Sequence, residues 1–192
     1  MYTRQEDIER LESSLGAPVV AQMTYEISRG EFDMVKSSMR NGRAHDVTMF
    51  IRKHDDHDCI AVIRKPFFPP GVFRAPSGAA NSGESLANGA VRESKEETGL
   101  DVELTRYVAR IDARFTCSDD LIEWMSHVLE ARQLAGRICP IDTHEIAEAR
   151  WATLAELQGP MRQALLDTDA GLFRYRVALH DLTVAELMEV AP

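Results

Sequence analysis

The sequence predicts an α/β fold, because β-rich runs and helical patterns alternate along its 192 residues. Two runs rich in β-branched and aliphatic residues, 47–53 and 59–65, are separated by five polar residues, as in an antiparallel hairpin. A helical pattern follows at 85–98. Further strand-like runs lie at 101–113, 122–133 and 146–154. With 44% hydrophobic and 28% charged residues, the chain can form one well-buried core.

The first 44 residues are expected to form an extension to that core. A helix is predicted between Thr3, as its N-cap, and Gly16, because aliphatic residues recur there at helical spacing and glycine commonly ends a helix. Residues 17–44 combine a strand-like run with a stretch rich in Gly, Arg and Asn that indicates no element. We therefore divide the chain into 1–44, a dimer or substrate element, and 45–192, the main domain.

The remaining segments are assigned from their composition. The polar cluster 54–58 (HDDHD) contains metal-capable side chains, but its place between two strands favours a solvated turn, and we assign it no chemistry. The Pro-, Gly- and Ser-rich segment 65–85 is expected to be loop, with a short strand at 72–75. Helical patterns at 154–166 and 181–190 predict two C-terminal helices.

Charge and hydropathy exclude several classes of partner. The net charge of −9, from 31 acidic and 22 basic residues, would repel a long nucleic acid, so we expect none as a partner. A small anionic substrate is compatible with this charge, because a bound divalent cation reverses the local field. No apolar run approaches the roughly 20 residues that cross a bilayer, and the N-terminal run lacks the apolar core of a signal peptide. We expect no membrane partner and a cytoplasmic location.

A cluster of acids lies on the predicted helix 85–98. Glu93, Glu96 and Glu97 stand at positions i, i+3 and i+4, which share one helix face. Their repulsion costs roughly a few tenths of a kcal/mol per pair, and a divalent cation held by carboxylate oxygens would offset it. Arg92 beside them would orient one acid through a charge-assisted hydrogen bond. Taken alone, the cluster is better interpreted as a solvated helix face.

The preceding loop favours metal binding. Gly78, Glu84 and Arg92 stand before the acids, and Gly99 and Leu100 follow them, in the order Gly-x5-Glu-x7-Arg-Glu-Ser-x-Glu-Glu-x-Gly-Leu. This segment resembles the Nudix box, G-x5-E-x7-R-E-U-x-E-E-x-G-U, where U is a large aliphatic residue. Eight of the nine fixed positions match over 23 residues. The chain is therefore identified as similar to the Nudix hydrolase family.

Three positions depart from the family pattern. Ser94 replaces the aliphatic residue expected to pack the back of the helix, which forfeits about 1 to 3 kcal/mol of burial. Ser77 replaces a Gly common just before the box, and Asn81 stands where many members carry Glu. Because Ser77 and Asn81 lie in the loop that shapes the metal and phosphate site, they bear on activity, whereas Ser94 bears on stability.

The resemblance implies a fold and a set of metal ligands. The fold is an α/β/α sandwich with a mixed sheet, in which the box helix lies against the sheet. Glu93, Glu96 and Glu97 would bind Mg²⁺, or Mn²⁺ in its place. Glu145, shortly before Trp151, matches a further acid of many members and would complete the ligand set. A surface acid in a loop is the alternative for Glu145.

The other box residues would shape the site and move a proton. Glu84 and Arg92 would hold the loop and helix together, and Gly78 would let the backbone approach metal or phosphate closely. Metal ions would clamp the phosphates and lower the pKa of the attacking water. Glu96 or Glu145 would accept the proton of that water.

The substrate is indicated by the run before the box. Residues 63–78 are similar to the corresponding run of ADP-ribose and nucleotide-sugar pyrophosphatases, where Arg64, Lys65 and Arg74 would bind phosphate. Three aromatics would either stack on a base or belong to the core. These are Phe67, Phe68 and Phe73.

The resemblance thus implies a Mg²⁺-dependent hydrolase that cleaves the diphosphate bond of a nucleoside diphosphate linked to another moiety, and a homodimer is expected from the family. Two alternatives stay open. One is a pyrophosphatase that clears damaged nucleoside triphosphates, and the other is a Nudix-fold module that senses a nucleotide without cleaving it. Product identity separates the two enzymes, and tight binding without turnover would indicate the sensor.

Overall fold

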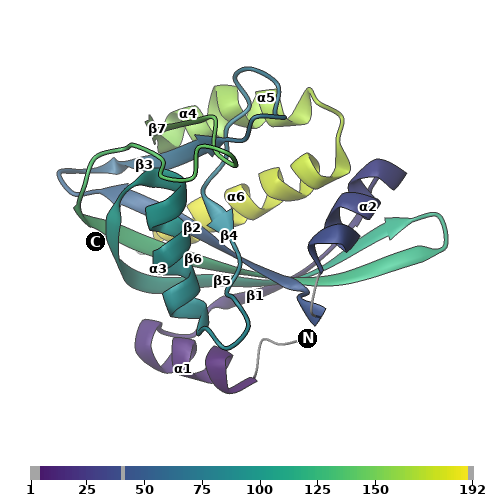
Figure 1. Ribbon diagram of the computed structural model, residues 1–192, viewed down its shortest axis with the longest axis horizontal. Helices are drawn as coiled ribbons and strands as arrows, with labels where there is room; N and C mark the ends of the chain where they lie inside the picture. Colours follow the sequence, from purple (N-terminus) through teal and green to yellow (C-terminus); the bar gives the residue numbers. More distant parts are fainter. Residues whose placement is uncertain (1–4, 40–41, 190–192) are drawn as a thin grey trace.

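A computed structural model of the protein describes residues 5–39 and 42–189 and shows a seven-stranded mixed sheet between two layers of helices (Figure 1). The strands are Val19–Glu26 (β1), His45–Lys53 (β2), Asp56–Arg64 (β3), Ser77–Gly78 (β4), Asp101–Cys117 (β5), Asp120–Ala135 (β6) and Glu148–Thr153 (β7). The helices are Gln5–Leu15 (α1), Arg29–Ser38 (α2), Leu86–Thr98 (α3), Leu154–Glu156 (α4), Arg162–Leu166 (α5) and Gly171–Glu189 (α6), with a π-helical turn at Leu157–Met161. The predicted α/β/α sandwich is confirmed.

The sheet is mixed because its strands pair in both directions. The order is β1-β5-β6-β2-β3-β7, with β4 paired to β2. The β1–β5 and β2–β6 pairs are parallel, whereas β5–β6, β2–β3 and β3–β7 are antiparallel. The central strand β2 is buried from His45 to Ile51, as expected for a strand covered on both faces.

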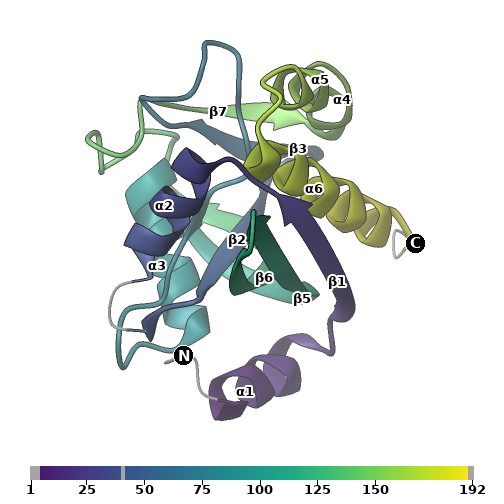
Figure 2. The ribbon, with the colours of Figure 1, turned by 90° about the vertical axis from the view of Figure 1, so that its right-hand side faces the viewer.

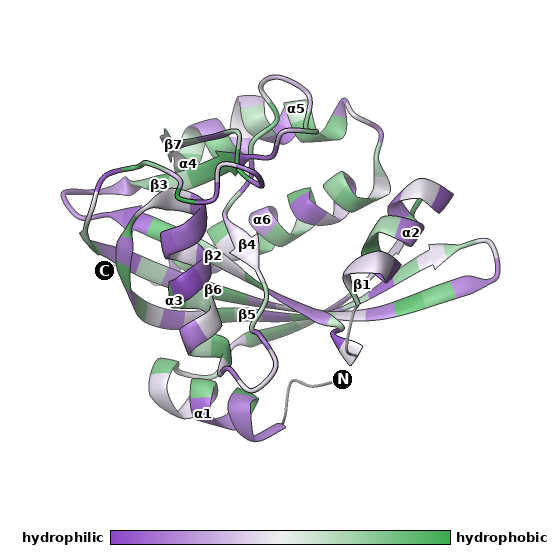
Figure 3. Ribbon diagram, viewed as in Figure 1, coloured by the Kyte–Doolittle hydropathy of each residue, from purple (hydrophilic) through white to green (hydrophobic). Residues whose placement is uncertain are grey.

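Successive side chains of β2 point to opposite faces of the sheet, and each face carries its own hydrophobic core. Met49 and Ile51 point to the face covered by α1 and α3, and Phe50 points to the face covered by α2 and α6. Figure 2 shows α1 and α6 on opposite sides of the strands. In Figure 3 the central strands carry hydrophobic residues, while α3 carries hydrophilic ones on its outer side. Of the acids of α3, Glu93 and Glu96 are partly exposed and Glu97 is buried.

The box helix begins and ends as predicted. The Ser85 side chain caps α3 by accepting from the backbone N–H of Asn88 at 3.2 Å. Gly99 ends the helix with φ of +80°, a left-handed conformation that favours glycine. Gly16 ends α1 in the same way, with φ of +86°. Thr3, the predicted N-cap of α1, lies outside the described residues.

Several elements differ from the sequence-based expectation. Residues 29–38 form helix α2, which the sequence analysis left unassigned. The strand β3 begins at Asp56, so the turn after β2 is shorter than the polar cluster 54–58. Residues 72–75 make one isolated β-bridge, between Arg74 and Ile63, rather than a strand. The last helix begins at residue 171, ten residues before the predicted start.

The N-terminal segment contributes directly to the sheet. Strand β1 pairs with β5 over eight residues, and α2 packs on the same side as α6. Its role as a dimer or substrate element, and the division at residue 45, stay predictions. Within the described part of the chain, no helix has the length and hydropathy needed to cross a membrane.

Candidate active site

Arg92 fixes the loop before α3 to the acidic face of that helix. Its guanidinium donates to both carboxylate oxygens of Glu84, at 3.1 and 3.0 Å, and to the Ala79 carbonyl at 2.7 Å. Nη1 also donates to Glu93 Oε1 at 3.0 Å and to Glu96 Oε2 at 2.8 Å. The hydrogen bonds with Glu84 lower the pKa of that acid and raise the pKa of Arg92. The expected shaping role of Glu84 and Arg92 agrees with these contacts.

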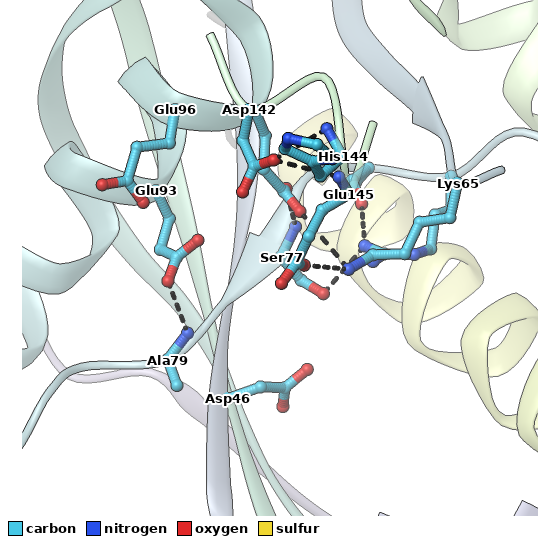
Figure 4. A network of polar contacts seen from close by, with 12 residues as sticks. Asp46, Lys65, Ser77, Ala79, Glu93, Glu96, Asp142, His144 and Glu145 are labelled. Carbon is cyan, nitrogen blue, oxygen red and sulfur yellow. Dashed lines mark hydrogen bonds and ion pairs between the residues drawn. The ribbon is translucent and has the colours of Figure 1, made fainter. Parts of the chain in front are cut away.

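Gly78 lies directly beside the Glu93 side chain. A Cβ at residue 78 would stand 2.0 Å from Glu93 Cδ, which no side chain tolerates without moving. The backbone N–H of Ala79 donates to Glu93 Oε1 at 3.2 Å (Figure 4). The missing Cβ therefore admits a carboxylate, whereas the sequence analysis expected it to admit metal or phosphate.

Glu97 is the most buried acid of the box. Its carboxylate accepts from the backbone N–H of Ser77 at 2.8 Å, and Lys65 Nζ lies 3.9 Å from its other oxygen. Burial raises the pKa of Glu97 to about 7, although Arg74 and Lys65 oppose this shift. A metal ion bound beside Glu97 would favour the ionised form of its carboxylate.

A loop after β6 forms the opposite wall of the site. Its backbone is fixed to the end of α3, because the N–H groups of Ile141 and Asp142 both donate to the Glu96 carbonyl, at 2.9 and 3.0 Å. The loop carries Glu145, whose Oε2 accepts from Lys65 Nζ at 2.8 Å (Figure 4). Asp142 Oδ1 accepts from the backbone N–H of Glu145 at 3.0 Å. The sequence analysis missed Asp142, although an Asp three residues before Glu145 is typical of such a turn.

These acids line one cavity of about 190 Å³. The predicted residues in its wall are Lys65, Gly78, Glu93, Glu96, Glu97 and Glu145, and the structure adds Arg43, Ser77, Ala79 and Asp142. Five carboxylates thus face two basic side chains across a small space. Such a cavity suits a substrate group whose charge is balanced by bound cations.

The donor set of this cavity fits a hard divalent cation in its chemistry, since every acidic ligand offers oxygen. In the part of the chain described, however, no three acidic, imidazole or thiol groups stand close enough to hold a metal as they are. The reason is visible in the ion pairs: Arg92 holds Glu93 and Glu96, while Lys65 holds Glu145. Metal binding therefore requires these carboxylates to turn towards one another.

The remaining candidate residues lie around this cavity or away from it. Arg74 is buried and lines an adjoining cavity, whereas Arg64 pairs with Glu148 at 3.4 Å and lines neither. Phe68 and Phe73 belong to hydrophobic cores, and Phe67 is exposed.

The departures from the box pattern have local explanations. Ser94 is fully buried, and its hydroxyl donates to the Ala90 carbonyl at 2.8 Å. The Ser77 hydroxyl accepts from Arg74 Nη1 at 2.8 Å, so Ser77 bridges Arg74 and Glu97. The backbone N–H of Asn81 donates to Glu84 at 2.8 Å.

Comparisons with known proteins find relatives of this chain among hydrolases. Nudix hydrolase 8 of Arabidopsis thaliana is 34% identical over 56% of this chain and 29% of its own length. NAD-capped RNA hydrolase NudC of Stutzerimonas stutzeri (strain A1501) is 31% identical over 56% of this chain and 37% of its own. A crystal structure of UDP-X diphosphatase aligns with a TM-score of 0.46 and 18% identity, covering 64% of this chain and 59% of that one. The chain spans about a third of the length of the curated relatives it matches. The profile of the NUDIX domain matches residues 42–174, and the chain belongs to the Nudix family.

Proposed function

We propose that this chain is a pyrophosphohydrolase that cleaves the diphosphate bond of a nucleoside diphosphate linked to another moiety, with Mg²⁺ or Mn²⁺ as its cofactor. One observation carries the proposal: the Nudix-box acids and the loop acid Glu145 line the same cavity as Lys65 and Arg43. A diphosphate needs cations to neutralise its oxygens and a base for the attacking water, and this cavity offers groups for both tasks.

The residues divide into three roles. Glu93, Glu96, Glu97 and Glu145 would hold the metal, which supplies charge neutralisation and an acidified water when bound. Lys65 and Arg43 stand on the other wall and would bind phosphate oxygens. Either Glu96 or Glu145 would take the proton of the attacking water. Both side chains are partly exposed at the cavity, and each forms an ion pair with a basic side chain through only one of its two carboxylate oxygens.

The experiment is a product assay with Mg²⁺ or Mn²⁺ over ADP-ribose, nucleotide sugars, NAD, dinucleoside polyphosphates and nucleoside triphosphates. The Glu97→Gln variant tests the site, and Glu103→Gln, an exposed acid paired with Arg132, is the matched control. We expect release of a nucleoside monophosphate from at least one substrate, lost by orders of magnitude in Glu97→Gln and retained in Glu103→Gln. Tight nucleotide binding without turnover in any protein would replace the proposal by the sensor alternative.

Two finer points stay within the proposal. The NudC relatives are named as hydrolases of NAD-capped RNA, so a short NAD-capped RNA belongs in the same panel and tests the expectation of no nucleic-acid partner. A homodimer is proposed from the family, and sedimentation of the full chain tests it. The cytoplasmic location stays a prediction.

A further inference from the structure

A second cavity, of about 220 Å³, adjoins the acidic one, and we call it the inner pocket. It lies between α2 and the first turns of α6, and the β5–β6 hairpin closes it with Phe115 and Trp124. Ser77 and Gly78 line both cavities, as do Arg43 and Lys65. A molecule seated on the box acids can therefore extend into the inner pocket.

The inner pocket holds more positive than negative charge, in contrast to the whole chain. Its charged lining residues are Arg43, Asp46, Lys65, Arg74 and Arg176. Four basic side chains thus share the space with one carboxylate, whereas the chain carries a net charge of −9. Buried like charges repel one another, and a negatively charged group that enters the pocket would offset that repulsion.

Arg74 is a buried cation that makes no ion pair with any described residue. It is 6% exposed, and its Nη1 donates to the Ala75 carbonyl at 2.7 Å and to the Ser77 hydroxyl at 2.8 Å. Burial, together with the charge of the nearby Arg176, lowers the pKa of its guanidinium to about 10. An anion beside Arg74 would remove this penalty.

Arg176 is held in place by its neighbours. Nη1 donates to the Thr48 hydroxyl at 2.8 Å, and Nη2 lies 3.4 Å from Asp46 Oδ2. The other oxygen of Asp46 accepts from Trp124 Nε1 at 3.0 Å and from the Ser126 hydroxyl. The one carboxylate of the pocket is thereby already committed to Arg176, and it makes no ion pair with Arg43 or Arg74 among the described residues.

Arg43 completes the site from the side of the acidic cavity. Its guanidinium carbon lies 5.5 Å from the centre of the Trp124 ring. Its Nε is buried and has no hydrogen-bond partner among the described residues. A buried donor without an acceptor costs about 1 to 3 kcal/mol, which a ligand oxygen would recover.

Resting on the proposed function, we propose that the inner pocket binds a negatively charged group that the substrate carries beyond its scissile diphosphate. The group is a phosphomonoester or a carboxylate, bound by Arg43, Arg74 and Arg176. The preferred substrate is then a nucleoside diphosphate derivative with an additional anionic substituent.

The test measures binding by calorimetry, without divalent metal so that no turnover occurs. It uses three pairs that differ in one anionic group: NADP and NAD, coenzyme A and dephospho-coenzyme A, and UDP-glucuronate and UDP-glucose. We expect the anionic member of at least one pair to bind about tenfold more tightly, because hydrogen bonds to charged groups contribute at this level. The first two pairs indicate a phosphomonoester, and the third indicates a carboxylate.

Variants of the pocket arginines test whether the tighter binding of the anionic member depends on the inner pocket. Arg176→Gln should remove the preference while sparing the neutral member, and Arg176→Lys should keep part of it. Arg43→Gln should also remove the preference, together with some affinity for both members, because Arg43 lines the acidic cavity as well. Arg43→Gln guards against misfolding of Arg176→Gln, because within the described residues the Arg43 guanidinium lies over the Trp124 ring and its Nε makes no hydrogen bond. Arg174→Gln, on the same helix but paired with Asp169 at the surface, is the control.

Two outcomes overturn the inference. One is that no pair shows a preference, or that no member binds at all. The other is that Arg176→Gln weakens both members equally, since the pocket would then hold the shared diphosphate. The proposed function is tested separately. A preference that depends on the arginines, without hydrolysis of any substrate, would support the anion site and contradict the proposed enzyme activity. Hydrolysis without such a preference would support the enzyme activity and contradict the anion site.

Discussion

The backbone at Gly78 runs so close to Glu93 that a Cβ there would lie 2.2 Å from Glu93 Oε2. The carboxylate occupies the space that any other residue would fill. Because the Ala79 N–H and Arg92 both donate to the other oxygen, Glu93 is held from two sides against the loop. The loop thereby sets the position of one of the proposed metal ligands.

Replacing that glycine tests this relationship. Gly78→Ala should displace the Glu93 carboxylate and lower both Mn²⁺ affinity and turnover by roughly 100-fold, the scale on which a displaced ligand or orienting group acts. Manganese titration followed by electron spin resonance measures the first effect. Gly30→Ala is the control, because a Cβ there meets no atom within 4 Å. Unchanged Mn²⁺ affinity in Gly78→Ala would show that Glu93 is not a ligand.

Lys65 Nζ lies 3.9 Å from Glu97 Oε1 and 2.8 Å from Glu145 Oε2, so its ammonium would compete with a metal for these two carboxylates. Lys65→Met keeps the length of the side chain and removes its charge, so Mn²⁺ should bind roughly tenfold more tightly. The Michaelis constant should rise in the same variant, because a phosphate oxygen loses a cationic partner. Lys53→Met, at a surface pair with Asp55, should change neither quantity. Weaker Mn²⁺ binding in Lys65→Met would show that the ammonium supports the metal site.

We expect serine at position 94 to stabilise the fold more than the large aliphatic residue of the family pattern, because Ser94 is fully buried and a larger side chain would overpack its surroundings. Ser94→Ala should leave the free energy of unfolding within about 0.5 kcal/mol, since the hydroxyl only adds a bond to a helix carbonyl and alanine favours helix. Ser94→Leu should lower it by about 1 to 3 kcal/mol through overpacking. Urea unfolding measures both. A stabilising leucine would mean that the packing at this position is loose.

Three buried histidines should make the protein sensitive to mild acid. Burial lowers the pKa of His45 to about 4 and of His127 to about 3, and it lowers the pKa of His180 as well. Below about pH 6.5 the unfolded chain binds these protons and the folded chain does not, so stability falls as pH falls. Glu97 acts in the opposite sense in the metal-free protein, because its pKa is raised to about 7 and the folded state keeps its proton.

The net effect is measurable by urea unfolding between pH 7.5 and 5. We expect a loss on the order of 1 to 3 kcal/mol per pH unit below about pH 6.5. His127→Asn removes one titrating group and keeps an acceptor near the Tyr107 hydroxyl, which contacts His127 Nδ1 at 2.6 Å. That variant should show a shallower slope, and an unchanged slope would mean that His127 is protonated in the folded state.

The box helix could be predicted because its signals are local. Ser85 and Gly99 mark the ends of α3, and the spacing of the three glutamates places them on one face. The contact between Arg92 and Glu84 is expected from the family resemblance, because both residues are fixed positions of the box. In each case the interacting groups are close in sequence, so one pattern contains both.

The features that the sequence analysis missed are of two kinds. Some depend on contacts between segments far apart in the sequence, and one depends on a local motif that was overlooked. Helix α2 begins with a capping box formed by Ser28 and Glu31, which was readable in the sequence but lay in a stretch dominated by Gly, Arg and Asn. Arg176 meets Asp46 across 130 residues, and no local pattern indicates such a contact. The early start of α6 also depends on packing, because its N-terminal turns cover the inner pocket.

The loop opposite α3 is attached to it through main-chain atoms: besides the two bonds to the Glu96 carbonyl, the N–H of Cys139 donates to the Thr98 carbonyl at 2.9 Å. These bonds join the two walls of the acidic cavity through backbone atoms, independently of the side chains that the loop carries. Ile141, which is exposed, can be exchanged without disturbing the spacing of the acids. The backbone of the site is thus fixed by main-chain hydrogen bonds, whereas exposed side chains of the loop can be substituted. Point substitutions in the loop can therefore accommodate new substrates.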